Sequence, residues 1–253
     1  LSRHDALPIY LRACLVNVKA LGHPTLTITN VATSTLAREA SMLLEIHAGP
    51  EIAVASTKAY VGQIMILTIL SFALSNQKLF DLHMELSRVA IAMEAIIDDR
   101  EYIQRLVKQH FTKRNCFYIG RGLDYYTCLE AALKLKEISY IQTEGFAAGE
   151  LKHGTIALIE DGVPVIAIIS QSNINNNTRA NIREVTARGA VKLVISLQSL
   201  SDVSDEIILM DVHEMLSPLV TVIPTQLIAY YSALELHRDI DKPRNLAKSV
   251  TVE

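Results

Sequence analysis

The chain has few cysteines, and none of them stands in a pattern that builds a framework. There are three in 253 residues (Cys14, Cys116 and Cys128), and no two have Cys-x-x-Cys spacing. Disulfide-rich domains and zinc sites need even or closely spaced sets, so the sequence argues against both classes. The pattern favours reduced thiols in a cytoplasmic protein, and no metal site is expected.

Long hydrophobic runs and charge of one sign are also missing. The formal net charge is −3, and Lys and Arg are scattered, whereas a nucleic-acid surface needs a basic patch or stripe. The most apolar run, from Val61 to Leu74, is interrupted by Gln63 and Thr68 and is shorter than the roughly 20 residues that cross a bilayer. We therefore expect no nucleic acid partner and no membrane segment, and we interpret this run as a buried helix.

What is present is the composition of a globular protein. Half of the residues are hydrophobic and a fifth are charged, and the length allows one large or two ordinary domains. Stretches with helical period alternate with short β-branched stretches, which predicts an α/β fold with parallel sheets. The predicted strands are 25–30, 42–47, 116–120, 164–170, 191–196 and 206–212. The predicted helices are 11–21, 33–40, 56–75, two within 79–109, one that ends at Gly145, 173–188 and 218–236.

One order of elements occurs twice along the chain. Each occurrence has a strand, a polar connection, a second strand and then a long apolar helix. The two sets are 26–29, 43–46 and the helix after 56, and 193–196, 207–210 and the helix after 217. Two interpretations stay open: a duplicated α/β lobe whose first copy lacks its beginning, or the plain alternation that many α/β proteins have.

The stretch 130–154 concentrates acid and base groups. Lys134 and Glu137 are three residues apart, so both side chains leave the same side of a helix, and His153 follows in a loop rich in glycine. A lysine, a carboxylate and a histidine around one loop are typical of proton transfer. The alternative is that Glu130, Lys134 and Glu137 form surface ion pairs and that His153 is an ordinary loop residue.

Just before this stretch, Gly120-Arg-Gly122 follows a predicted strand and precedes a helix. Phosphates often bind at such a position, but the same glycines also serve a tight turn, and as a phosphate loop this motif alone is a weak signal.

A set of ordered motifs gives these residues a family context. The motifs are Gly49-Pro-Glu-Ile-Ala-Val-Ala-Ser-Thr-Lys-Ala-Tyr60, Gly120-Arg-Gly122, Ala132-Leu-Lys-Leu-Lys-Glu-Ile-Ser-Tyr140, Gly149-Glu-Leu-Lys-His-Gly154 and Pro243-Arg-Asn-Leu-Ala-Lys-Ser-Val-Thr-Val-Glu253. From about Gly22 onward the chain resembles the isomerase half of the glucosamine-6-phosphate synthases. The resemblance implies two sugar-isomerase (SIS) lobes, each a parallel sheet flanked by helices. The expected division is 1–110 for an incomplete first lobe with connecting helices, 111–238 for the second lobe, and 239–253 for an extended active-site tail.

The resemblance also implies roles for individual residues. Lys248 matches the lysine that forms a Schiff base with open-chain fructose-6-phosphate, and Glu137 matches the base that moves a proton between C1 and C2. Lys134 matches a cation near the C2 oxygen. His153 matches the ring-opening histidine, which in the family reaches the site of a neighbouring subunit, so a homodimer is expected. No cofactor is implied.

Three further positions match residues that contact the substrate: Val54, Ser56 and Ala247. At Ser56-Thr57 the plainer alternative is a helix N-cap.

The chain departs from the family pattern at its start. Residues 3–10 stand where the family has a hydroxyl-rich phosphate loop, and they contain no hydroxyl before Tyr10. No residues of the family's glutaminase domain are present, and the sequence looks like a fragment that begins inside a domain. The predicted function is conversion of fructose-6-phosphate to glucosamine-6-phosphate, with weakened phosphate binding. The alternative is a SIS-type module that binds sugar phosphates without turnover.

Overall fold

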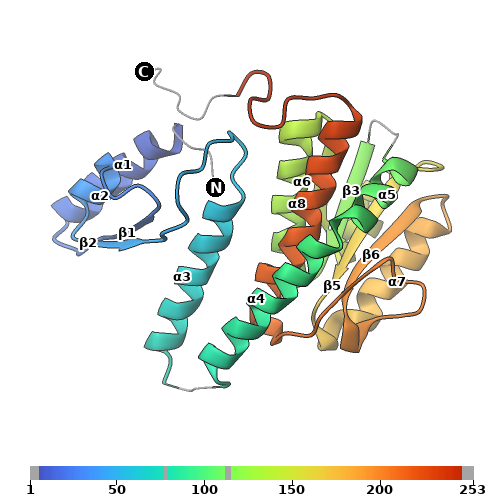
Figure 1. Cartoon of the computed structure of the whole chain (residues 1–253), viewed down its shortest axis with the longest axis horizontal. Helices are drawn as coiled ribbons and strands as arrows, with labels where there is room; N and C mark the ends of the chain where they lie inside the picture. Colours follow the sequence, from blue (N-terminus) through green and yellow to red (C-terminus); the bar gives the residue numbers. More distant parts are fainter. Residues whose placement is uncertain (1–5, 77–78, 112–114, 247–253) are drawn as a thin grey trace. The chain divides into compact units, whose positions relative to one another are not determined.

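The structure is a computed structural model, and it describes residues 6–76, 79–111 and 115–246. Contacts divide the chain into two compact units. Unit 1 comprises residues 1–79 and 241–253, and unit 2 comprises residues 80–240. Figure 1 shows the elements of both units.

Unit 1 contains a parallel pair of strands with helices. Its elements are α1 (Ala6–Ala20), β1 (Leu26–Thr29), α2 (Thr35–Glu39), β2 (Met42–Glu45) and α3 (Lys58–Leu74). Strand β1 pairs in parallel with β2, with Leu26 opposite Met42. The Ser34 side chain caps α2 by accepting a hydrogen bond from the Ala37 amide. These elements confirm the strands and helices expected in this part of the chain.

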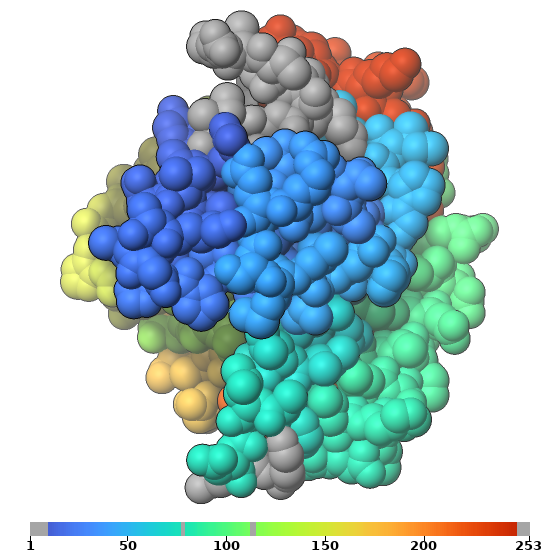
Figure 2. Space-filling view, turned by 90° about the vertical axis from the view of Figure 1, so that its left-hand side faces the viewer, coloured from blue at the N-terminus to red at the C-terminus, as the bar shows by residue number. Residues whose placement is uncertain are grey.

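Helix α3 forms where a helix was expected, but the interpretation of this apolar run as a buried helix is wrong. None of its residues is buried, and Leu74 is 75% exposed. A two-stranded sheet offers too little area to cover a helix of 17 residues on all sides. Gly62 is its point of close approach to Ile46, since a Cβ there would lie 3.3 Å from the Ile46 Cδ1. Figure 2 shows atoms of α3, in cyan to teal, at the molecular surface.

Unit 2 is a layered α/β structure built on a five-stranded sheet. Its longer elements are α4 (Leu82–Asp98), α5 (Arg100–His110), β3 (Asn115–Gly120), α6 (Leu123–Ser139), β4 (Gln142–Ala147), β5 (Pro164–Ile169), α7 (Asn175–Thr186), β6 (Val191–Leu197), β7 (Ile207–Leu209) and α8 (Ser217–Glu235). Among its described residues it also has five short 3-10 helices: η1 (Ala148–His153), η2 (Thr155–Leu158), η3 (Ser172–Ile174), η4 (Gln198–Leu200) and η5 (Glu214–Leu216). The strand order is β4-β3-β5-β6-β7, and every pairing is parallel. Helices α6 and α8 pack together on one face of the sheet, and α7 lies on the other (Figure 1).

The core of unit 2 follows from strand alternation. All six residues of β5 are buried, as expected for an interior parallel strand covered on both faces. Phe117, Val165 and Ala167 join one apolar cluster with Ile182 and Val185 of α7. Because successive side chains alternate across a strand, the other buried residues of these strands face α6 and α8.

Strand β4 corrects the expectation of a helix that runs to Gly145. Helix α6 ends at Ser139, Tyr140 adopts a left-handed conformation with φ 66°, and β4 pairs with β3 over its whole length. The pairing partner lies 27 positions earlier in the chain, so local helix propensity could not reveal it. Gly145 allows β4 to approach α6, since a Cβ there would lie 2.7 Å from the Cys128 carbonyl oxygen.

Candidate active site

Helix α6 carries a buried cluster of three charged side chains. Glu130, Lys134 and Glu137 occupy positions i, i+4 and i+7, which lie on one face of a helix. The Lys134 Nζ is 2.7 Å from Glu137 Oε2 and 3.5 Å from Glu130 Oε1. The Lys134 side chain is only 2% exposed. These are therefore not surface ion pairs, and that alternative is wrong.

Burial determines the electrostatics of this cluster. A buried ammonium without a counter-charge is strongly unfavourable, which explains why Lys134 lies between two carboxylates. Burial raises the pKa of Glu130, and the opposite charge of Lys134 reduces that rise. Among the described residues, Glu130 Oε1 is within ion-pair distance of Lys134 but receives no hydrogen bond. Glu130 Oε1 can therefore accept a further hydrogen bond close to the buried Lys134 ammonium.

His153 lies at the end of the short helix η1, beyond strand β4. Its side chain is exposed, and Gly154 follows it with a φ of 149°. The buried residues Ala148 and Leu151 anchor η1. Lys152 forms an ion pair of 2.7 Å with Glu184 of α7. The histidine is therefore presented to solvent from a segment that is held in place.

The two described substrate-contact candidates belong to unit 1. Ser56 is buried, Val54 is half-buried, and the Val54 amide donates a hydrogen bond of 3.0 Å to the Asp241 carbonyl. This bond joins the loop before α3 to the first residue of the C-terminal segment in unit 1.

The proposed helix N-cap at Ser56-Thr57 is not formed by a side chain of this pair, because the N-cap Thr57 makes no such hydrogen bond. Instead, the Glu51 carboxylate accepts hydrogen bonds from the amides of Thr57 and Ala59, at 2.9 and 3.2 Å. A carboxylate at this position also suits the positive end of the helix dipole.

Lys248 and Ala247 lie outside the described residues.

A second buried polar cluster was missed by sequence reasoning. Asp124, in the first turn of α6, accepts hydrogen bonds from the Ser170 amide at 2.9 Å and from the Ser170 hydroxyl. The Ser170 hydroxyl lies 2.7 Å from that of Ser217, which in turn donates to the Glu214 carbonyl. Burial raises the pKa of Asp124 to about 6. The cluster joins α6, β5 and α8, and because its members are far apart in sequence, no local pattern indicates it.

The number of hydroxyl protons in this cluster agrees with the raised pKa of Asp124. Each serine hydroxyl has one proton to donate. If Asp124 is ionised, Ser170 donates its proton to Asp124 and Ser217 donates its proton to the Glu214 carbonyl. No proton is then left for the contact between the two serine hydroxyls. When Asp124 is protonated, its bond with the Ser170 hydroxyl can reverse, so that Asp124 donates to Ser170, Ser170 donates to Ser217 and Ser217 donates to the Glu214 carbonyl. Every contact is then satisfied.

The Gly120-Arg-Gly122 loop is closed by side chains of this unit. Gly122 has a φ of 55°, and the next amide, of Leu123, donates to the Gln171 side chain at 2.7 Å. The Asp124 amide donates to the Arg121 carbonyl at 3.0 Å. Because these donors already have partners, the geometry favours a tight turn over a phosphate loop.

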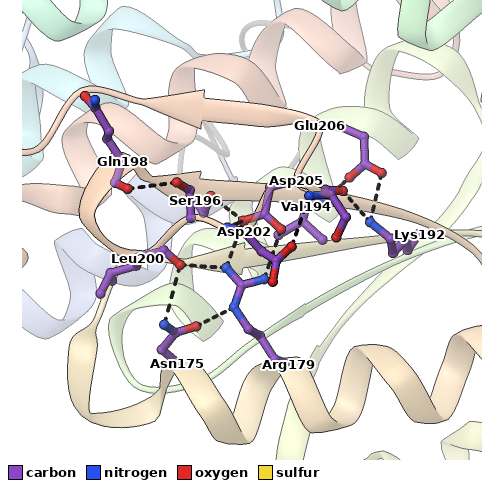
Figure 3. A network of polar contacts seen from close by, with 12 residues as sticks. Asn175, Arg179, Lys192, Val194, Ser196, Gln198, Leu200, Asp202, Asp205 and Glu206 are labelled. Atoms are coloured by element: carbon purple, nitrogen blue, oxygen red, sulfur yellow. Dashed lines mark hydrogen bonds and ion pairs between the residues drawn. The ribbon is translucent and has the colours of Figure 1, made fainter.

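A third network, drawn in Figure 3, is structural. Arg179 of α7 donates to both carboxylate oxygens of Asp205, at 2.9 and 2.8 Å, and also to the Leu200 carbonyl and the Asn175 side chain. Ser196 donates to Asp205 as well. Burial opposes ionisation of Asp205, but these donors outweigh it and lower its pKa. The network ties α7 to the connection between β6 and β7.

In residues 6–76, 79–111 and 115–246, no helix is both long and apolar enough to cross a membrane. In the same part of the chain, no group of three or more His, Cys, Asp or Glu side chains is placed to hold a metal ion.

Comparison with known proteins places the chain in a family. The SIS domain family model matches residues 2–73 and 111–236, one segment before and one after the connecting helices. The chain is 58% identical over 247 residues to a glutamine–fructose-6-phosphate aminotransferase (isomerizing) of Bacillus licheniformis, and 56% identical to that of Staphylococcus aureus. Each match covers 96% of this chain and 41% of the relative, so the chain spans about two-fifths of the length of these relatives.

Solved structures agree with this placement. The C-terminal domain of glucosamine-fructose-6-phosphate aminotransferase from Francisella tularensis superposes with a TM-score of 0.82 at 31% identity, over 90% of this chain and 69% of that one. A glucosamine-6-phosphate deaminase from Thermotoga maritima, 21% identical with a TM-score of 0.77, shares the fold. The chain therefore belongs to the SIS family, among the C-terminal domains of the glutamine–fructose-6-phosphate aminotransferases.

Proposed function

We propose that this chain is an isomerase and amination domain that converts fructose-6-phosphate to glucosamine-6-phosphate. The observation that carries the proposal is the buried cluster on α6, in which Glu137 and Lys134 lie 2.7 Å apart. The aminotransferase names of relatives that match 96% of the chain support the choice of substrate. A domain that only bound sugar phosphates would not need a buried ammonium between two carboxylates, because such an arrangement is costly to desolvate.

In the proposed reaction, Lys248 attacks the C2 carbonyl of the open-chain sugar and forms a Schiff base with loss of water. Ammonia, as a second substrate, then replaces the lysine at C2, which frees Lys248 and leaves a C2 imine. Glu137 takes a proton from C1 and returns it to C2, so that the carboxylate is regenerated. Before the water leaves, Lys134 stabilises negative charge on the C2 oxygen. Val54, Ser56 and Ala247 contact the sugar, and no cofactor takes part.

His153 opens the sugar ring, and we propose that it acts in the site of a neighbouring subunit of a homodimer. The exposed side chain at the end of η1 supports a role outside its own fold. A surface loop anchored by buried residues is a suitable platform for such a contact.

For the functional division we propose an incomplete first lobe with connecting helices at 1–110, a second lobe at 111–238 and an active-site tail at 239–253. The two segments matched by the SIS family model support two lobes. The order of β1, β2 and α3 also recurs as β6, β7 and α8, each set with a parallel strand pair before a long helix. We place the protein in the cytoplasm.

Borohydride trapping tests the Schiff base. The chain is incubated with millimolar fructose-6-phosphate and reduced, and the modified lysine is mapped by mass spectrometry. We expect the label on Lys248 and none in Lys248→Ala. Exchange of the C1 hydrogen in D₂O, followed by NMR, tests turnover.

Glu137→Gln should keep the label and lose the exchange, because its amide cannot act as the base. Sugar phosphate binding without label or exchange in the unmodified chain would instead support a non-catalytic binding module.

A further inference from the structure

The buried lysine on α6 is shared between two carboxylates, and the proposed reaction uses only one of them. Lys134 Nζ is 2.7 Å from Glu137 and 3.5 Å from Glu130. Glu130 is 7% exposed, and its Oε1 receives no hydrogen bond from the described residues. An unsatisfied carboxylate oxygen inside a protein is unfavourable and calls for a physical explanation.

The proposed proton transfer changes the charge balance of this cluster. At rest, one ammonium lies between two carboxylates. When Glu137 takes the C1 proton it becomes neutral, and the buried ammonium loses its nearer counter-charge. This loss makes the step less favourable, because a buried ammonium depends on nearby negative charge.

We propose that Glu130 is a positioning residue for this reaction, whose carboxylate takes over the Lys134 ammonium while Glu137 carries the substrate proton. The inference rests on the proposed function. The proton leaves C1 for Glu137 and is delivered to C2, so Glu130 exchanges no proton with the sugar. Glu130 Oε1, which accepts no hydrogen bond from the described residues, lies 3.5 Å from the ammonium. Only a small movement of the lysine side chain would bring it to ordinary hydrogen-bond distance.

The charge of Glu137 affects the pKa of Glu130 in the direction that the change of lysine partner requires. Burial raises the pKa of Glu130, Lys134 lowers it, and the like charge of Glu137 raises it further. When Glu137 becomes neutral, its raising influence disappears, and the ammonium is free to stabilise ionised Glu130. The carboxylate thus becomes a better partner for Lys134 at the moment when one is needed.

A purely structural ion pair is the competing explanation, and kinetics separates the two. Glu130→Gln should lower kcat for C1 hydrogen exchange about 10-fold or more and leave KM within about twofold. The reason is that the negative charge of Glu130 acts during proton transfer from C1 and not during substrate binding. Glu130→Asp, which keeps the charge, should recover part of the rate. Glu101→Gln, which removes an exposed carboxylate of α5, is the matched control and should match the unmodified chain.

A titration tests, without turnover, whether Lys134 changes its carboxylate partner from Glu137 to Glu130. Glu137→Gln imitates the state in which Glu137 carries the proton, and ¹³C NMR of the side-chain carboxyls reports the pKa of Glu130. We expect this pKa to fall by about one unit or more in Glu137→Gln, since a like charge is removed and the ammonium is released.

An unchanged or higher Glu130 pKa in Glu137→Gln would overturn the inference, as would a Glu130→Gln variant with the kcat of the unmodified chain. If the unmodified chain shows no C1 exchange, the proposed function fails, and the titration still decides whether the lysine changes partner.

Discussion

The buried carboxyl of Asp124 makes the stability of unit 2 depend on pH, and Asp124→Asn should remove that dependence. Asp124 is 1% exposed and is bonded to Ser170, which in turn contacts Ser217. Asparagine has the same shape, and its amide group can face the Ser170 hydroxyl as the protonated acid would. The substitution therefore removes the titration and keeps most of the packing.

The magnitude follows from the pKa. Burial raises it from 3.8 to about 6, with the charge of Glu214 adding to the rise and the Ser170 hydrogen bonds opposing it. Below pH 3.8 the carboxyl is protonated in both states; between 3.8 and 6 the unfolded chain ionises while the folded chain keeps its proton. Stability from this group is thus complete at low pH and lost as pH rises through 6. The loss is about 3 kcal/mol in all, with about 1.3 kcal/mol between pH 5 and pH 7.

The assay is urea unfolding of the unmodified chain and Asp124→Asn from pH 5 to pH 8, followed by circular dichroism. The informative quantity is the difference in unfolding free energy between the two proteins, since other groups titrate equally in both. Between pH 5 and pH 7, we expect the unfolding free energy of Asp124→Asn to rise by about 1.3 kcal/mol relative to that of the unmodified chain. Asp98→Asn, at an exposed position of α4, should show no such trend. A flat difference, or one that falls with pH, would refute the raised pKa of Asp124.

Three further outcomes are expected. Gly145→Ala should lower the melting temperature by several degrees, because the added Cβ would collide with the backbone of α6 and separate β4 from it. Arg179→Met should destabilise the chain by about 3–5 kcal/mol in urea unfolding, since it leaves the buried Asp205 charge without its cation; replacing both partners with apolar residues should cost less. If His153 acts in a neighbouring subunit as proposed, a mixture of His153→Ala and Glu137→Gln chains should recover C1 exchange that neither variant shows alone, and no recovery would mean that the histidine acts within its own chain.

Much of unit 2 was predictable because its signals are local. The apolar run 164–169 predicted an interior parallel strand, and β5 is buried throughout. Helix and strand alternation predicted a parallel α/β sheet, which the strand order confirms. Lys134 and Glu137 were expected on one side of a helix from their spacing alone, and they form an ion pair there.

Other features depended on partners far away in the chain. Strand β4 was mistaken for helix because its ladder with β3 comes from residues 27 positions earlier. Helix α3 was expected to be buried because its composition is apolar, although composition does not state how much sheet is available to cover it. The carboxylate cap on α3 comes from Glu51, outside the local pair that was considered.

The sequence by itself determined the family, the α/β class and the residue types that can transfer a proton, because these depend on local order, period and spacing. Only the tertiary structure decided which charges lose their water. Glu130, Lys134 and Glu137 have the spacing of ordinary surface ion pairs, and the packing around α6 turns them into a buried cluster. From its position in the sequence, Asp124 is an ordinary carboxylate in the first turn of a helix. In the folded chain it is buried against the segments at β5 and α8, and this burial raises its pKa. Desolvation is a property of what surrounds a side chain, and those neighbours come from every part of the chain.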